Sequence, residues 1–156
     1  MINRLEELRH KIDKMIFKYQ PDNSRYYISH LYGVSQYCTF IAVKRGLDAE
    51  IAAASGMLHD IYQVVEGTTK DHAIRGAVIA GDILKELGIY EKEEINIITT
   101  AISKHSKKRK VHEPYDELLK DGDVMDHCFY NPDFPVLDKE VVRYNNLLRE
   151  FGCAGA

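Results

Sequence analysis

The sequence of 156 residues has few cysteines and nothing that marks a secreted protein. The three cysteines, Cys38, Cys128 and Cys153, are odd in number and show no CxxC spacing. They therefore predict neither a disulfide framework nor a zinc ribbon, and a reducing compartment fits them best.

Long apolar runs are also missing, and the N-terminal stretch MINRLEELRHKIDKMIF carries charges throughout. A secretory signal needs an apolar segment behind a basic start, and a membrane helix needs about 20 apolar residues. We therefore expect a cytoplasmic protein that has no membrane partner.

An excess of positive charge is absent too, because the formal net charge is −3. Duplex nucleic acid is bound through a broad positive surface, so this class of partner is disfavoured. The one basic cluster runs from Lys104 to Lys110 and adjoins His105. It is either a solvated helix end near the negative pole of the helix dipole, or a rim that attracts a phosphorylated substrate.

Apolar residues recur at helical spacing almost everywhere, and no segment alternates as a strand does. With 45% hydrophobic and 29% charged residues, we expect residues 1–156 to fold as a single domain. The predicted fold is all-α, an orthogonal bundle of about six or seven helices. The expected helices are a first one with an apolar stripe from Ile2 to Ile16, then 24–45, 49–65, 68–87, 91–104, 114–128 and 137–151.

The sharpest local signal is His59 followed by Asp60, within an alanine-rich helix that is expected to be buried. An ionised aspartate is rarely buried without a partner. Adjacent helical residues point about 100° apart, so this pair can reach one metal ion only from a helix end or through different rotamers. A purely structural role for the pair is also open.

Three more histidines, His30, His72 and His105, fall at or near predicted helix ends. Each has an ordinary explanation as a core, first-turn or C-terminal residue. Asp123 stands close to Asp121 and Asp126, and three such carboxylates repel one another unless a cation or solvent relieves them.

Four imidazoles and two carboxylates together suit one or two ions of Fe, Mn, Zn, Co or Ni rather than calcium. The candidate metal ligands are His30, His59, Asp60, His72, His105 and Asp123.

The order His30, His59-Asp60, Asp123 resembles the H…HD…D signature of the HD superfamily of metal-dependent phosphohydrolases. The resemblance covers about residues 24–128. Residues 121–126 are similar to the family's DADxLD segment, and residues 71–77 to the HxxxGAxxA segment of members with two metals. His105 resembles a further histidine of those members. Residues 61–63 depart from the cyclic-diguanylate phosphodiesterase and alarmone hydrolase branches, and the GYP motif is absent.

The resemblance implies a six-ligand, two-metal site like that of the bacterial HD-domain hydrolases of diadenosine tetraphosphate. His59 and Asp60 would be catalytic, with Asp60 bridging two ions and a metal-activated hydroxide attacking phosphorus. The substrate would be a phosphate ester or anhydride of a nucleotide or another small phosphorylated metabolite.

Arg25, Lys104 and Lys108 are candidates for holding the substrate's phosphate, and Tyr62 for lining the pocket. Surface solubility is the alternative for the cations, and packing is the alternative for the tyrosine. The same six ligands would also serve a di-iron oxygenase, or a nucleotide-binding module without turnover. A purely structural helical bundle is a further alternative. The chain could also form a homodimer.

Overall fold

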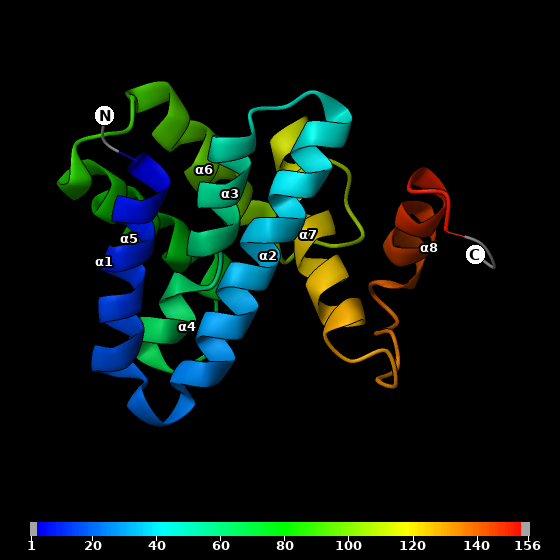
Figure 1. The fold of residues 1–156 in the computed structure, drawn as a ribbon, viewed down its shortest axis with the longest axis horizontal. Helices are drawn as coiled ribbons and strands as arrows, with labels where there is room; N and C mark the ends of the chain where they lie inside the picture. The colour runs from blue at the N-terminus through cyan, green and yellow to red at the C-terminus, as the bar shows by residue number, and fades with distance from the viewer. Residues whose placement is uncertain (1–2, 154–156) are drawn as a thin grey trace.

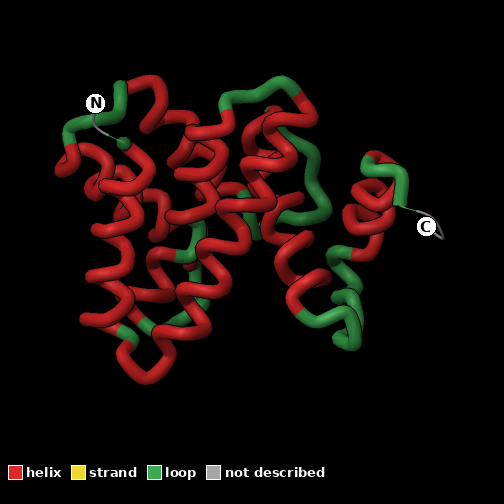
Figure 2. Tube along the Cα trace, viewed as in Figure 1, coloured by secondary structure: helices red, strands yellow, loops and turns green. Residues whose placement is uncertain are grey.

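The computed structural model describes residues 3–153, which form helices and connecting loops without a strand (Figures 1 and 2). The predicted all-helical fold is confirmed. Residues 1–2 and 154–156, including Ile2 of the predicted stripe, lie outside the described part. The described residues form a 3-10 turn at Pro21–Asn23 and the helices α1 (Arg4–Tyr19), α2 (Ser24–Arg45), α3 (Ala49–Leu58), α4 (Ile61–Glu66), α5 (His72–Leu87), α6 (Lys92–Lys104), α7 (Pro114–Tyr130) and α8 (Val141–Glu150).

The helix predicted over residues 49–65 is in fact two helices, because the chain breaks at the His-Asp pair. His59 keeps helical angles (φ −57°, ψ −36°), whereas Asp60 departs from them (φ −108°, ψ 21°). The break raises the number of α-helices among residues 3–153 from the predicted six or seven to eight. It also places His59 at the end of α3 and Asp60 at the start of α4, where both side chains can face one point.

Most helix ends lie where the sequence predicts them. The Asp48 side chain accepts hydrogen bonds from the first turn of α3, and Gly46 ends α2 in the left-handed conformation (φ 68°). The start of α5 is an exception. Thr68 was expected to open this helix, but Asp71 adopts a left-handed φ of 55° and the helix begins at His72.

Helix α2 occupies the centre of the bundle and packs against both α3 and α7 (Figure 1). Two glycines permit this close approach. A Cβ atom at Gly56 would lie 2.6 Å from the Cα atom of Ser35, and one at Gly122 would collide with the sulfur of Cys38. The close packing brings His30 of α2 next to the ends of α3 and to α7.

No helix among residues 3–153 has the length and apolar character that are needed to cross a membrane. The three cysteines are free thiols, and two of them, Cys38 and Cys128, are buried.

We predict that Gly56→Ala lowers the free energy of unfolding by about 3 kcal/mol, because the new methyl group meets backbone atoms of α2 that have no space to move. Urea denaturation followed by circular dichroism measures the effect. Gly81→Ala is the matched control, since its Cβ would lie 3.4 Å from Thr99 Cγ2 and helix propensity favours alanine. Equal stability of the two variants would contradict the packing argument.

Candidate metal centre

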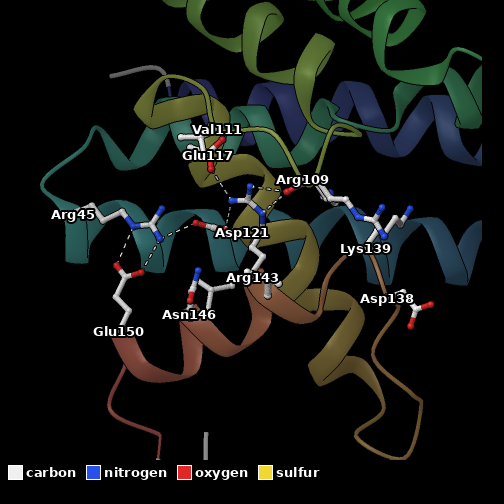
Figure 3. A pocket seen from close by; sticks show the side chains of 13 residues that line it. Arg45, Arg109, Val111, Glu117, Asp121, Asp138, Lys139, Arg143, Asn146 and Glu150 are labelled. Carbon is white, nitrogen blue, oxygen red and sulfur yellow. Dashed lines mark hydrogen bonds and ion pairs between the residues drawn. The ribbon is translucent and has the colours of Figure 1, made fainter.

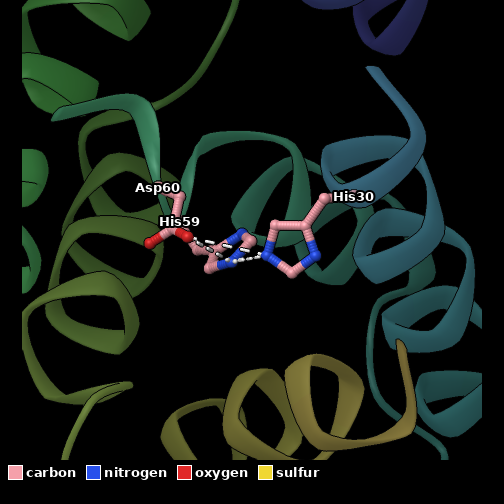
Figure 4. Close-up of side chains that lie close together, drawn as sticks. All are labelled: His30, His59 and Asp60. Atoms are coloured by element: carbon pink, nitrogen blue, oxygen red, sulfur yellow. Dashed lines mark hydrogen bonds and ion pairs between the residues drawn. The ribbon is translucent and has the colours of Figure 1, made fainter. Parts of the chain in front are cut away.

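Four imidazoles converge in two pairs near the middle of the molecule. The Nε2 atoms of His30 and His59 are 3.1 Å apart, and those of His72 and His105 are also 3.1 Å apart. The first pair comes from α2 and the end of α3, as Figure 4 shows, and the second from the start of α5 and the end of α6. Helix ends supply three of the four side chains.

The Nδ1 atom of each ring faces a hydrogen-bond acceptor and donates its hydrogen atom to it, so Nε2 is the atom that faces the partner ring. Two lone pairs at this distance repel unless a proton or a cation lies between them. Ligating histidines are oriented in the same way by an acceptor on the second nitrogen. The acceptors are Asp126 Oδ2 for His30 (2.7 Å), Gly56 O for His59 (2.8 Å), Thr69 O for His72 (2.8 Å) and Ile102 O for His105 (2.7 Å).

Asp60 lies between the two pairs and directs one carboxylate oxygen toward each. Its Oδ2 is 3.6 Å from His30 Nε2 and 3.5 Å from His59 Nε2. Its Oδ1 is 3.5 Å from His72 Nε2 and 3.4 Å from His105 Nε2. Oδ1 is buried and has no hydrogen-bond partner among the described residues. A buried anionic oxygen of this kind calls for a cation.

Asp123 completes the group around the first pair. Its Oδ1 lies 3.7 Å from His30 Nε2 and 3.6 Å from His59 Nε2, and it too is buried without a hydrogen-bond partner in the described part of the chain. Its Oδ2 accepts a hydrogen bond from the ammonium group of Lys108. All six predicted ligands are therefore brought together.

The three neighbouring aspartates of α7 avoid mutual repulsion because each has a different partner. Asp121 pairs with Arg45 and Arg143, at 2.7 Å in both cases. Asp126 accepts from His30, and Asp123 faces the centre.

Charges around the centre keep its carboxylates ionised. Burial by itself would raise the pKa of Asp60, but the imidazoles of His59, His105 and His30 hold it well below its usual range. Burial likewise acts against Asp123, whose pKa is lowered by Lys108 and His59. For His30, burial opposes protonation, yet the hydrogen bonds to Asp126 and Asp60 raise its pKa to about 10.

The donor set fits one or two transition-metal ions. Imidazole nitrogens and carboxylate oxygens suit Zn, Fe, Mn, Co and Ni, whereas calcium prefers oxygen alone. At the centre, Asp60 Oδ1 and Asp123 Oδ1 have no hydrogen-bond partner among the described residues, and they point to where such ions would bind. Groups of three that could hold an ion include His30, His59 and Asp60 on one side, and Asp60, His72 and His105 on the other. Asp123 joins His30 and His127 in one further group, and His59 and His105 in another.

Two residues near the centre were not predicted from the sequence. Asp126 orients His30, and the Nε2 atom of His127 lies 3.3 Å from Asp123 Oδ1. The His127 ring stacks on His30 with centroids 5.3 Å apart, and its Nδ1 is 3.1 Å from Glu140 Oε1. The sequence contains a signal for His127, because this residue follows Asp123 by four positions and therefore lies on the same face of α7.

The four predicted substrate-binding residues have different environments. Lys108 is buried against Asp123. Lys104 forms a 2.8 Å ion pair with Asp116, and the buried Tyr62 accepts a 3.1 Å hydrogen bond from Arg75. Arg25 is exposed. Of these four residues, only Lys108 forms a hydrogen bond or ion pair with one of the six candidate ligands within residues 3–153.

The loop that carries Lys108 is held in place by α8. Arg143 of α8 donates hydrogen bonds to the Lys108 carbonyl oxygen at 2.9 and 3.3 Å, and it pairs with Glu117 at 2.9 Å. These ion pairs line a charged cavity of about 490 Å³ (Figure 3). Helix α8 therefore supports the centre from outside.

The chain matches known proteins over the region that carries the centre. The HD domain family model matches residues 27–130, which include His30, the His-Asp pair and Asp123 but not α8. Ribonuclease Y from Desulfotalea psychrophila is 29% identical over 110 residues. The aligned region is 69% of this chain but 19% of that protein, so the chain spans a small part of its relative. No solved structure matches the chain at a significant level.

Removal of bound metal should lower the melting temperature, because four imidazoles and two carboxylates would then face one another without a cation. A ligand present at 100 times its Kd stabilises by about 2.7 kcal/mol. Differential scanning fluorimetry with EDTA, followed by re-addition of Mn²⁺ or Zn²⁺, measures the shift. Asp60→Asn should abolish the response, and an unchanged response in that variant would contradict the role of Asp60.

Asp126→Asn should weaken metal binding by about 10- to 100-fold, because a neutral amide orients His30 less firmly than a carboxylate does. Competition titration with a chromophoric chelator measures the Kd. Asp82→Asn is the control, since the Asp82 side chain is 72% exposed on α5. If both variants bind metal as the wild type does, Asp126 has no influence on the centre.

Proposed function

Since this chain belongs to the HD domain family, whose members are generally metal-dependent phosphohydrolases, we propose that it hydrolyses a phosphate ester or anhydride of a small metabolite. Nucleotides are the first class to test. The single observation that carries the proposal is the placement of Asp60, whose two oxygens face two separate pairs of imidazoles. Two ions so placed would act on one phosphate.

Bound divalent ions would lower the pKa of water and polarise a phosphoryl oxygen. The residues of the chain then hold and orient the reacting groups. His59 and Asp60 are fixed by the break between α3 and α4, and we assign them the central role. Lys108 neutralises the outer oxygen of Asp123 and adds positive charge beside the incoming phosphate. His127, whose side chain is 37% exposed, offers a nitrogen donor on the solvent side.

The two buried cysteines offer no competing nucleophile. Burial raises the pKa of the thiols of Cys38 and Cys128, so both are protonated and poor nucleophiles. Hydrolysis by activated water needs no side-chain nucleophile.

The similarity to ribonuclease Y supports phosphoester chemistry, because a ribonuclease cleaves phosphodiester bonds of RNA. The matched region is 19% of that protein, so RNA is included as one candidate substrate in the experiment below.

The proposal is tested by a screen of nucleoside mono-, di- and polyphosphates and a short RNA with Mn²⁺, Co²⁺, Fe²⁺ and Zn²⁺. We expect phosphate release that Asp60→Asn and Asp60→Ala reduce by at least about 100-fold, since outer-shell changes alone cost 10- to 100-fold. Asp82→Ala, on the exposed face of α5, should retain full activity.

Activity that survives in Asp60→Ala would refute the mechanism. Iron-dependent oxygen consumption with an organic diol or phosphonate, without phosphate release, would identify an oxygenase instead. Nucleotides that bind but stay intact would identify a binding module.

A further inference from the structure

A second, smaller cavity of about 200 Å³ lies beside the metal centre and is lined largely by rings. Three of them are the aromatic side chains Tyr26, Tyr130 and Phe134, and two are the imidazoles His30 and His127. His30 is a candidate ligand, and His127 is 3.3 Å from another, Asp123. The cavity and the centre therefore share a wall.

The three aromatic side chains remain largely exposed although they gather around one cavity. Tyr26 is 58% exposed, Tyr130 62% and Phe134 59%. They come from α2, the last residue of α7 and the loop before α8. Exposed aromatic residues that cluster in this way mark a binding surface, and their faces favour contact with another ring.

The rings around His30 are already stacked. Tyr26 lies over His30 with a centroid distance of 5.9 Å and an angle of 15° between the planes, and His127 lies at 5.3 Å and 5°. A flat group that enters the cavity thus meets parallel rings beside the Nε2 atoms that face Asp60 and Asp123. A phosphate joined to that group on the side of His30 and His127 would face the wall that the cavity shares with the centre.

The cavity is large enough to hold only part of a ligand. Pockets that hold whole drug-sized ligands measure about 300–1,000 Å³, so about 200 Å³ suits one ring system. We propose that this cavity binds the nucleobase of a nucleotide whose phosphate lies at the metal centre. The inference rests on the proposed function and narrows its substrate class to phosphates that carry a planar ring.

The loop that carries Phe134 is held in position by local hydrogen bonds. The Phe134 amide donates to the Asn131 carbonyl oxygen at 3.0 Å, and Glu140 anchors the far end of the loop to His127 at 3.1 Å. Phe134 follows residue 130, where the match to the HD domain family ends. Phe134 would thus add to the cavity a ring from beyond the matched region.

The test compares the binding of AMP with that of ribose 5-phosphate to the metal-loaded full chain by isothermal titration calorimetry. AMP should bind more tightly, because it alone carries the ring. Stacking of one base contributes enough that Phe134→Ala or Tyr130→Ala should weaken AMP binding by about 5- to 150-fold. Neither variant should change the binding of ribose 5-phosphate.

Two matched variants separate this role from general effects. Phe17→Ala removes a phenylalanine of equal exposure (58%) from α1 and should leave both affinities unchanged. Phe134→Tyr keeps a ring and should restore AMP binding. Circular dichroism should show an unaltered fold in every variant, since the substituted side chains are exposed.

Equal affinity for AMP and ribose 5-phosphate, with no effect of Phe134→Ala, would overturn the inference. If both compounds are nevertheless hydrolysed, the proposed function stays intact. AMP binding that depends on the ring, without any hydrolysis, would support the nucleobase site and contradict the proposed function. If Phe134→Ala instead converts a dimer into a monomer in light scattering and leaves AMP binding unchanged, the aromatic cluster is a contact between two copies, and the inference is wrong.

Discussion

The structure depends on one electrostatic constraint, which is the burial of two carboxylate oxygens, Asp60 Oδ1 and Asp123 Oδ1, without hydrogen-bond partners in the described residues. Burying an ionised oxygen is costly unless a positive charge compensates it. The surrounding imidazoles present nitrogen atoms in pairs 3.1 Å apart, a distance that itself needs a proton or a cation. The centre is thus arranged to hold positive charge.

Helix ends and close contacts between helices bring the side chains of the centre together. The chain breaks between α3 and α4 so that neighbouring side chains, His59 and Asp60, can face the same point. Gly56 and Gly122 let α2 approach α3 and α7 closely enough to bring His30 to that point. Farther out, Arg143 holds the loop of Lys108, and Glu140 holds His127. The C-terminal segment therefore positions residues of the centre, although it lies beyond the region matched to the HD domain family.

Much of this could be predicted from the sequence, because helical periodicity and the order of histidines and aspartates are local patterns. The all-helical fold follows from the periodicity, and the convergence of the six side chains is what the resemblance to the HD superfamily implies. The helix break at Asp60 could not be predicted, since the alanine-rich segment favours one continuous helix and only tertiary packing ends it. Asp126 and His127 share a helix with Asp123, yet their roles depend on how α2 and α7 face each other. The contact of Lys108 with Asp123 could not be predicted either, because it depends on the conformation of the loop after α6.

The most direct measurement is a crystal structure of protein purified without chelator, with anomalous diffraction recorded at the metal absorption edges. The account predicts anomalous peaks on both sides of the Asp60 carboxylate, at about 2.0–2.2 Å from imidazole Nε2 and carboxylate oxygen atoms. One side would include His30 and His59, and the other His72 and His105. Imidazole pairs joined only by protons, with no anomalous peak at Asp60 even after soaking in Mn²⁺ or Zn²⁺, would contradict it.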